Sequence, residues 1–428
     1  MILLGAVAAH PERVMTTSTL AASSATARAA RRAGVSVLTV LTAGAYLPSP
    51  LYPGYQGAFG ASDLAMTLVY ATFSLVSAPA LLLFGPASDA FGPRPLVRLG
   101  LVASAVGSVC FALAGGTGWL VLGRAAQGVA LGAATAAATA LIDASSSRGP
   151  ALASTAFLGG TAAGPILAGL VAEFAPAPRF VPFAVHLFAI VVVWRLVAEL
   201  PEPAGPRPRW RPTRPRIPAG MRLLFAGAAL TGFLAWLVAG LFLSVVPALA
   251  ARAGQTGPAV TGVVLGAVLI CSMLTQPLVL PLGPRRAELT GLGALLVSLV
   301  LLAATTGRSA PLTVLAAVVA GCGHGLAYGG AATAVRAAPA ERHGEVAGAL
   351  YLAFYLGSGI PAVCIGVLAL RAPLGTATAQ VALAALALVP LAGAGVLARR
   401  EPRRLSCDGV PRRTTPRRRS RRRSAARR

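Results

Sequence analysis

The chain has 428 residues, of which 56% are hydrophobic and only 11% are charged. A soluble domain carries about 25% charged residues, so this composition excludes a soluble globular protein and predicts a polytopic helical membrane protein. The formal net charge of +25 comes from 37 arginines without a single lysine, and their distribution along the chain decides which partners they favour.

The first 33 residues are predicted to form a mobile cytoplasmic segment. Residues 1–9 are apolar, but they are too few to cross a bilayer and no basic region precedes them, so we expect no signal peptide. Residues 16–33 are rich in Ser, Thr, Ala and Arg, which is typical of a segment without a packed core. Translation can start at Met1 or at Met15.

Twelve stretches are apolar and long enough, at about 20 residues, to cross a bilayer as helices. A proline- and arginine-rich cytoplasmic linker over 201–221 divides them six and six, because repeated proline excludes a helix there. We expect an all-α fold with six-helix bundles over 34–200 and 222–398 and a disordered arginine-rich tail over 399–428. The expected spans are 34–54, 64–84, 96–114, 119–142, 151–171 and 181–200, then 222–250, 258–280, 287–306, 311–334, 345–370 and 376–398.

The arginines favour one side of the predicted membrane. With the connections assigned alternately, 31 arginines fall on the side of both termini, four fall on the other side and two lie within spans. Because arginine is enriched in cytoplasmic loops, both termini are expected in the cytoplasm and the protein in the plasma membrane. The basic tail fits nucleic acid or anionic lipid. Its near lack of aromatic residues for base stacking favours lipid and argues against nucleic acid.

An internal repeat relates the two predicted bundles. Residues 85–94 and 276–285 each join the second and third spans of a bundle, and Pro, Gly, Pro and Arg recur in them at matching offsets. Two bundles related in this way are typical of secondary transporters, whose substrate site lies near the bilayer midplane between the repeats.

Three motifs, in the correct spans and order, resemble those of the major facilitator superfamily and, within it, of the drug:proton antiporters with twelve spans. The resemblance covers roughly residues 34–398 and implies twelve helices in two pseudo-symmetric six-helix bundles. Its motifs are Gly85, Asp89, Gly92 and Arg94 in the loop after span 2, Arg124 and Gln127 with Gly128 in span 4, and Gly160, Gly164, Pro165 and Gly169 in span 5, where Ala168 replaces a glycine.

The resemblance implies roles for the loop and span 5 motifs. Asp89 and Arg94 would latch the cytoplasmic end by contacting the eleventh span, although Ala90 and Pro93 stand where the family has basic residues and predict a weaker latch. The second copy carries Leu280 in place of the acidic residue and is expected to serve only as a turn. The span 5 motif would seal one end of the cavity against the other bundle, or would be ordinary packing of small residues.

Arg124 lies in the outer half of span 4. An unpaired charge in hydrocarbon costs at least about 2.5–3.5 kcal/mol, so the guanidinium must face a wet cavity, a carboxylate or backbone carbonyls. The resemblance assigns Arg124 and Gln127 to proton coupling or to the response to substrate. Snorkelling of Arg124 to the outer interface is the alternative.

A proton carrier is harder to find, because no span has a carboxylate near its middle. His324 in span 10 is the most deeply placed histidine, and an unperturbed pKa of about 6.5 suits proton exchange. A histidine that is merely hydrogen-bonded between helices fits equally well. His186 in span 6 is a weaker candidate.

In the family, spans 1, 4, 7 and 10 line the cavity. Here they offer an aromatic, weakly polar surface with one positive charge, which suits a moderately hydrophobic molecule, neutral or anionic, better than a dication. The candidates are Tyr46, Tyr52, Phe233, Trp236 and Tyr328, with Tyr351 and Tyr355 on one face of span 11.

We therefore expect a monomeric transporter that exports a small organic molecule or drug by alternating access, with protons as the coupling ion. An importer or uniporter of a sugar or metabolite on the same fold is the alternative, and a non-transporting sensor or scaffold is less favoured. An enzyme, a metal site or a cofactor is not expected, because the four histidines and five cysteines are scattered.

Overall fold

The computed structural model describes residues 17–143, 149–200, 209–212, 214, 216–254, 257–305, 308–339 and 342–399. Within these residues all regular secondary structure is helical, and 12 helices are long and apolar enough to cross a membrane, as the sequence predicts. The candidate start sites, residues 201–208, 213 and 215 of the expected linker and nearly all of the basic tail lie outside the described residues, so the expectations for them stay predictions.

The first half of the chain supplies six spans, and short helical pieces extend or connect them. Its elements are α1 (Thr17–Tyr46), the short 3-10 helix η1 (Ser49–Leu51), α2 (Tyr52–Phe59), α3 (Asp63–Phe84), α4 (Ala87–Phe91), α5 (Pro93–Ala112), α6 (Thr117–Asp143), α7 (Gly149–Phe174) and α8 (Val181–Ala198).

The second half repeats this plan. Its elements are η2 (Ala219–Met221), α9 (Arg222–Ser244), α10 (Val246–Arg252), α11 (Pro258–Thr275), η3 (Gln276–Leu278), α12 (Val279–Leu282), α13 (Pro284–Thr305), α14 (Ala310–Ala334), η4 (Val335–Ala337), α15 (His343–Leu368) and α16 (Leu374–Leu397).

The first helix differs from the sequence prediction at both ends. It begins at Thr17 rather than near residue 34, because 17–33 is rich in alanine, the strongest helix former. It ends at Tyr46, shortly before Pro48 and Pro50, which lack the amide hydrogen that a continuing helix needs. The expected span 34–54 is therefore a long helix followed by a turn and the short helix α2.

The internal repeat of the sequence is also a repeat of backbone conformation. Gly92 (φ 85°, ψ 162°) precedes α5, and Gly283 (φ 76°, ψ 156°) precedes α13. A side chain disfavours this region, so glycine is required at both turns. Each glycine is followed by a proline, Pro93 or Pro284, as the first helical residue, where a missing amide hydrogen is harmless.

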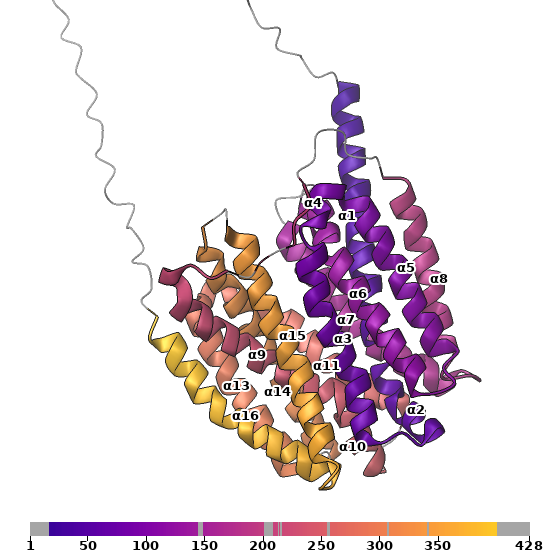
Figure 1. Ribbon diagram of the computed structural model, residues 1–428, viewed down its shortest axis with the longest axis vertical. Coiled ribbons are helices and arrows are strands. Elements are labelled where there is room, and N and C mark those ends of the chain that lie inside the picture. The colour runs from indigo at the N-terminus through magenta and orange to yellow at the C-terminus, as the bar shows by residue number, and fades with distance from the viewer. Residues whose placement is uncertain are drawn as a thin grey trace, which may run out of the picture. The chain divides into compact units, whose positions relative to one another are not determined.

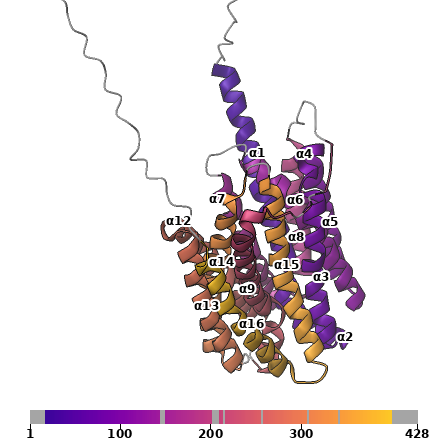
Figure 2. The same cartoon turned by 60° about the vertical axis from the view of Figure 1, so that its left-hand side comes forward.

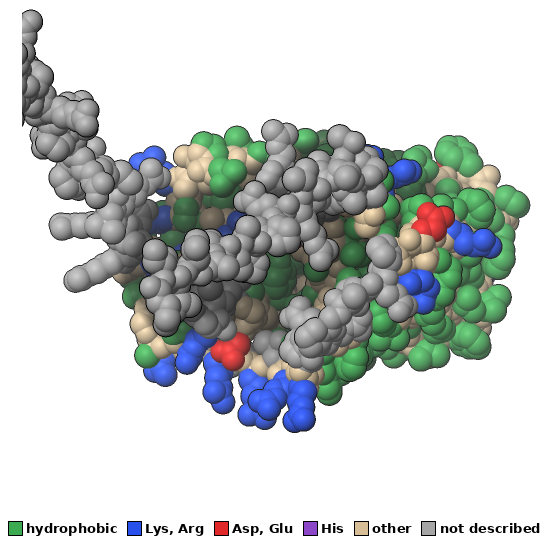
Figure 3. Space-filling view, turned by 90° about the horizontal axis from the view of Figure 1, so that it is seen from above, with side chains coloured by type: hydrophobic (Ala, Val, Ile, Leu, Met, Phe, Trp, Pro, Cys, Tyr) green, Lys and Arg blue, Asp and Glu red, His purple; other side chains and the backbone are tan. Residues whose placement is uncertain are grey.

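Two helix pairs join the halves: α7 packs against α11, and α3 packs against α15. Figure 2 shows α15 in front, running beside α3. The described chain starts and ends at one end of the helices, which we call the terminal face. The opposite end, where α2 and α10 lie, is the distal face (Figure 1). Seen from the terminal face, arginine side chains gather around the rim (Figure 3).

Candidate functional site

Arg124 is completely buried on α6, about two turns from its distal end. Its Nη1 atom donates to the backbone carbonyl of Ala45 and, over 2.9 Å, to Oε1 of Gln127. Gln127 in turn donates from Nε2 to the carbonyl of Gly44 at 2.9 Å. The two motif residues therefore form one unit that is fixed to the last turn of α1.

Two aromatic rings of α3 flank the Arg124 guanidinium. Its Cζ atom lies 4.5 Å from the ring centre of Phe73 and 5.6 Å from that of Tyr70, which are cation–π distances. Within the described part of the chain, Arg124 has no carboxylate partner, and its Nε and Nη2 atoms have no hydrogen-bond partner. The charge is thus held by carbonyls and ring faces alone.

The same rings connect Arg124 to the other half of the protein. The Tyr70 hydroxyl lies 2.9 Å from Oγ of Ser358 on α15. The Phe73 ring makes edge contacts with Tyr46 on α1, at 5.7 Å between centroids, and with Tyr355 on α15, at 6.4 Å. A change in the spacing of α3 and α15 would therefore alter the contacts of the two rings that flank the guanidinium.

A second cluster surrounds His324 on α14. The ring is completely buried, and its Nδ1 atom lies 2.8 Å from Oγ of Ser272 on α11. It stacks on Tyr328 with 5.5 Å between centroids and meets the edge of Trp236 at 4.9 Å. Its Nε2 atom has no hydrogen-bond partner among the described residues.

His186 on α8 differs, because both of its ring nitrogens are used. Nδ1 lies 2.7 Å from Oγ of Ser108, and Nε2 lies 3.0 Å from the carbonyl oxygen of Val40. A Cβ atom on Gly44 would lie 2.4 Å from His186 Nε2, so only glycine fits there. His186 thus packs against Gly44 of α1, whose carbonyl accepts the hydrogen bond from Gln127.

Most of the other predicted lining residues belong to one of these two clusters. The ring of Phe354 lies between those of Tyr328 and Tyr351, with centroid distances of 5.2 Å and 5.4 Å. Through Phe354, Tyr351 is therefore connected to the His324 cluster. Tyr351 is 37% exposed and Phe233 is half-buried. Tyr52, at the start of α2, is buried, and its hydroxyl has no hydrogen-bond partner among the described residues.

The loop motif lies at the terminal face. Gly85 ends α3, and Gly92 supplies the positive φ of the turn. Arg94 donates from Nη2 to the carbonyl of Ala198, which belongs to its own half. The side chain of Asp89 lies outside the described part, so the latch between halves stays a prediction.

The span 5 motif has two faces. Gly160 and Gly164 face α1: a Cβ on Gly164 would lie 2.3 Å from the carbonyl oxygen of Ala43. Gly169 faces α11 of the other half, where a Cβ would lie 2.3 Å from the carbonyl oxygen of Pro258, and Gly262 of α11 approaches the carbonyl of Pro165 as closely. The motif therefore allows close approach both within a half and between halves.

Polar contacts also join the halves at the distal face. Arg252 of α10 forms an ion pair with Asp63 of α3, with Nη2 and Oδ1 2.5 Å apart, and Gln56 donates to the same oxygen at 2.7 Å. The Ala259 amide at the start of α11 donates to Glu173 at 3.2 Å. The Arg252–Asp63 and Ala259–Glu173 contacts therefore link the two halves at the distal face.

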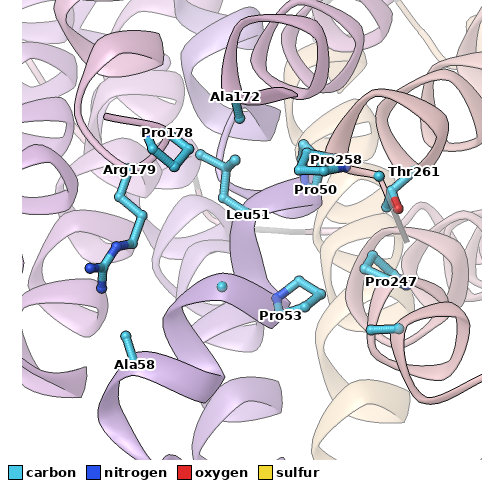
Figure 4. Close-up of a pocket in the computed structure, with 13 residues that line it drawn as sticks. Pro50, Leu51, Pro53, Ala58, Ala172, Pro178, Arg179, Pro247, Pro258 and Thr261 are labelled. Carbon is cyan, nitrogen blue, oxygen red and sulfur yellow. The ribbon is translucent and has the colours of Figure 1, made fainter. Parts of the chain in front are cut away.

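A cavity of about 370 Å³ lies beside these contacts. Figure 4 shows Leu51 and Pro53 on one side, Pro247 and Thr261 on the other, and Arg179 at the edge. Its walls come from η1, α2 and the end of α7 in the first half and from α10 and α11 in the second. The described residues contain no group of three His, Cys, Asp or Glu side chains that could hold a metal ion.

Sequence reasoning did not identify several residues of the site. Tyr70 and Phe73 belong to α3, whereas the sequence predicts lining residues only in spans 1, 4, 7, 10 and 11. Their spacing of three residues places both on one face of α3, which was the available signal. Ser272 and Ser358 carry no recognisable pattern, since single serines are common in apolar helices.

The model of the Major Facilitator Superfamily matches residues 35–362 of the chain. The tetracycline resistance protein, class B, of Escherichia coli is 31% identical over 173 residues, which are 37% of this chain and 42% of that protein. The chain thus aligns with less than half the length of this curated relative.

Two crystal structures of a bacterial homologue of the human lysosomal transporter Spinster are similar in fold to this chain. The inward-facing, unoccupied one has a TM-score of 0.66 at 15% identity and covers 87% of this chain and 96% of that chain. The inward-facing, occupied one has a TM-score of 0.63 at 15% identity, with coverages of 85% and 95%. At this identity the likeness shows the fold alone. Together with the family match, it confirms the expected fold class.

Proposed function

The chain belongs to the Major Facilitator Superfamily, and from this premise we propose that it exports a moderately hydrophobic organic molecule in exchange for protons. Family and fold identify a multi-pass membrane transporter. The observation that carries the proposal is the buried Arg124–Gln127 pair, which contacts α1 directly and reaches α15 of the other half through the α3 aromatics.

We propose that transport proceeds by alternating access of one central site. The Asp63–Arg252 ion pair and the Gly169–Gly262 contact would hold the distal end closed and would separate when that end opens. The arginines at the terminal face favour its placement in the cytoplasm of a plasma-membrane protein. Export as the direction is supported by the span 5 motif and by the name of the tetracycline resistance relative.

His324 is our candidate for the proton carrier. It is buried between α14, α11 and α9, and one ring nitrogen has a serine partner while the other has none among the described residues. In the tautomer whose Nδ1–H donates to Ser272, the Nε2 lone pair can accept a proton without breaking that hydrogen bond. Its stacking on Tyr328 links its position to the aromatic surface proposed to bind substrate.

The test is reconstitution into liposomes with an imposed pH gradient and an internal pH-sensitive dye. Addition of lipophilic compounds is expected to dissipate the gradient for the subset that is transported, and empty liposomes serve as the control. Accumulation that persists after a protonophore collapses the gradient would contradict proton coupling. Uptake that never depends on the gradient would instead favour the uniporter of a metabolite.

A further inference from the structure

We propose that the substrate carries a negative charge on a planar acid group, such as a carboxylate, and that the Nε–H and Nη2–H groups of Arg124 bind it. This inference rests on the proposed transport function and specifies the substrate class of the same site. Three properties of the guanidinium support it: an edge without partners among the described residues, the lack of a described counter-charge and aromatic surroundings.

The free edge follows from which nitrogens the protein already uses. Nη1 of Arg124 serves the Ala45 carbonyl and Gln127. Nε and Nη2 are buried and have no partner among the described residues. Both atoms lie in the guanidinium plane on one edge of the group, where Nε–H and one N–H of Nη2 point in the same direction, which is the geometry that binds a carboxylate with two hydrogen bonds.

The missing counter-charge points in the same direction. Arginine stays protonated in proteins, so the buried side chain of Arg124 keeps its positive charge. No described carboxylate lies within ion-pairing distance of it, and ring faces offset a buried charge only in part. An acid group brought by the substrate would supply both the charge and the hydrogen-bond acceptors. A cationic substrate would be repelled.

The aromatic rings around Arg124 indicate what the rest of the substrate should look like. Beside the guanidinium lie Tyr70 and Phe73, and the Phe73 ring in turn meets Tyr46 and Tyr355. Aromatic groups prefer edge and offset contacts with other rings, so a flat apolar body fits next to the acid. Because Tyr355 belongs to α15, a substrate bound to Arg124 would contact both halves. Its binding could therefore change how the two halves pack against each other.

The experiment compares three probes that share one aromatic body: naphthylacetate, naphthylacetamide and naphthylethylammonium. Their affinities for the purified full-length protein are measured by isothermal titration calorimetry. Naphthylacetate is expected to bind at least about tenfold more tightly than the amide, and the ammonium most weakly. Arg124→Gln is expected to abolish this preference while leaving the amide affinity within about twofold. Arg124→Lys keeps the charge without the parallel donors and should retain only part of the preference.

Arg371→Gln, an exposed arginine near the distal face, is the matched control and should leave all three affinities unchanged. The proposal is overturned if naphthylacetate does not bind, if the amide or ammonium binds as tightly, or if a folded Arg124→Gln or Arg124→Lys variant keeps the full preference. Calorimetry measures binding independently of transport. A preference for the anion without transport in liposomes would therefore refute the proposed function but still support this binding site.

Discussion

Arg94 at the start of α5 donates a hydrogen bond from Nη2 to the backbone carbonyl of Ala198, 2.8 Å away at the last residue of α8. Arg285 makes the same contact in the second half, with the carbonyl of Leu397 at the end of α16, over 3.0 Å. Helix carboxyl ends carry unpaired carbonyls and favour a cation. In each half, an arginine therefore clamps the last span to the third.

Loss of either clamp should lower thermal stability, and the two halves should differ. Arg94→Ala is expected to cost about 1–2 kcal/mol, because its contact is half-buried, whereas Arg285→Ala should cost about half as much at its exposed contact. Thermal unfolding of the purified variants measures the difference. Arg286→Ala, an exposed neighbour, is the control, and an equal loss in all three variants would refute the clamp.

Gly169 should be essential for closing the distal end. A Cβ there would lie 2.3 Å from a backbone oxygen of α11, so Gly169→Ala should force α7 and α11 apart and slow flux by at least about tenfold. Gly159→Ala on the same helix is the matched control, since its Cβ would meet only Met273 Sδ at 3.9 Å. Flux in proteoliposomes, normalised to the amount of folded protein, makes the comparison.

Gly164→Ala distinguishes the two interpretations of the span 5 motif, a seal between the halves and ordinary packing of small residues. Its Cβ would clash with Ala43 of the same half, so this variant should lose thermal stability without a selective effect on distal opening. Labelling of a cysteine introduced at Thr261, which lines the distal cavity, reports that opening. If Gly164→Ala and Gly169→Ala change labelling equally, the motif is ordinary packing.

The Asp63–Arg252 ion pair should bias the protein toward distal closure. Asp63 is 17% and Arg252 is 49% exposed, and such a pair is worth up to about 1 kcal/mol, so Asp63→Asn should raise the labelling rate of the Thr261 cysteine about two- to fivefold. A membrane-impermeant thiol reagent makes the measurement after the native cysteines are replaced by alanine. Restored protection in the Asp63→Arg, Arg252→Asp double variant would support the pair. Unchanged labelling in Asp63→Asn would refute it.

The spans were predictable because a bilayer demands a length of apolar sequence whatever the tertiary structure. Their interruptions were not. The expected span 222–250 breaks at Val245, just before Pro247, and 258–280 breaks after Thr275, just before Pro277. Proline marked both places, but whether a proline bends a helix or ends it depends on neighbouring helices. Pro165 lies inside a continuous α7, for example.

Within the candidate site, local pairs were predictable and distant ones were not. Arg124 and Gln127 are three residues apart on one helix, so the motif alone places them together. Arg252 and Asp63 are 189 residues apart, and no local pattern selects one partner for the other. The orientation of Arg124 toward the Ala45 carbonyl of α1 likewise depends on the tertiary packing of α1 against α6.

Among the described side chains, two buried histidines give the sharpest test of proton coupling, because they differ in the hydrogen bonding of the ring. His186 uses both nitrogens, with Ser108 and with the Val40 carbonyl, whereas Nε2 of His324 has no partner among the described residues. A proton carrier needs a nitrogen that can gain and release a proton during each cycle, so His324→Gln should abolish flux driven by the pH gradient. His186→Gln should keep that flux.

The decisive comparison uses flux with and without the gradient in the same proteoliposomes. His324→Gln is expected to lower gradient-driven flux by at least about tenfold while preserving exchange of substrate at equal pH, since general acid–base groups typically contribute rate factors of about this size or larger. His186→Gln should lower thermal stability instead, because it loosens α8 from the stretch of α1 that holds Gln127. Full gradient-driven flux in His324→Gln would assign the proton to another group, and loss of coupling in both variants would show that the hydrogen bonding of the two rings does not decide their roles.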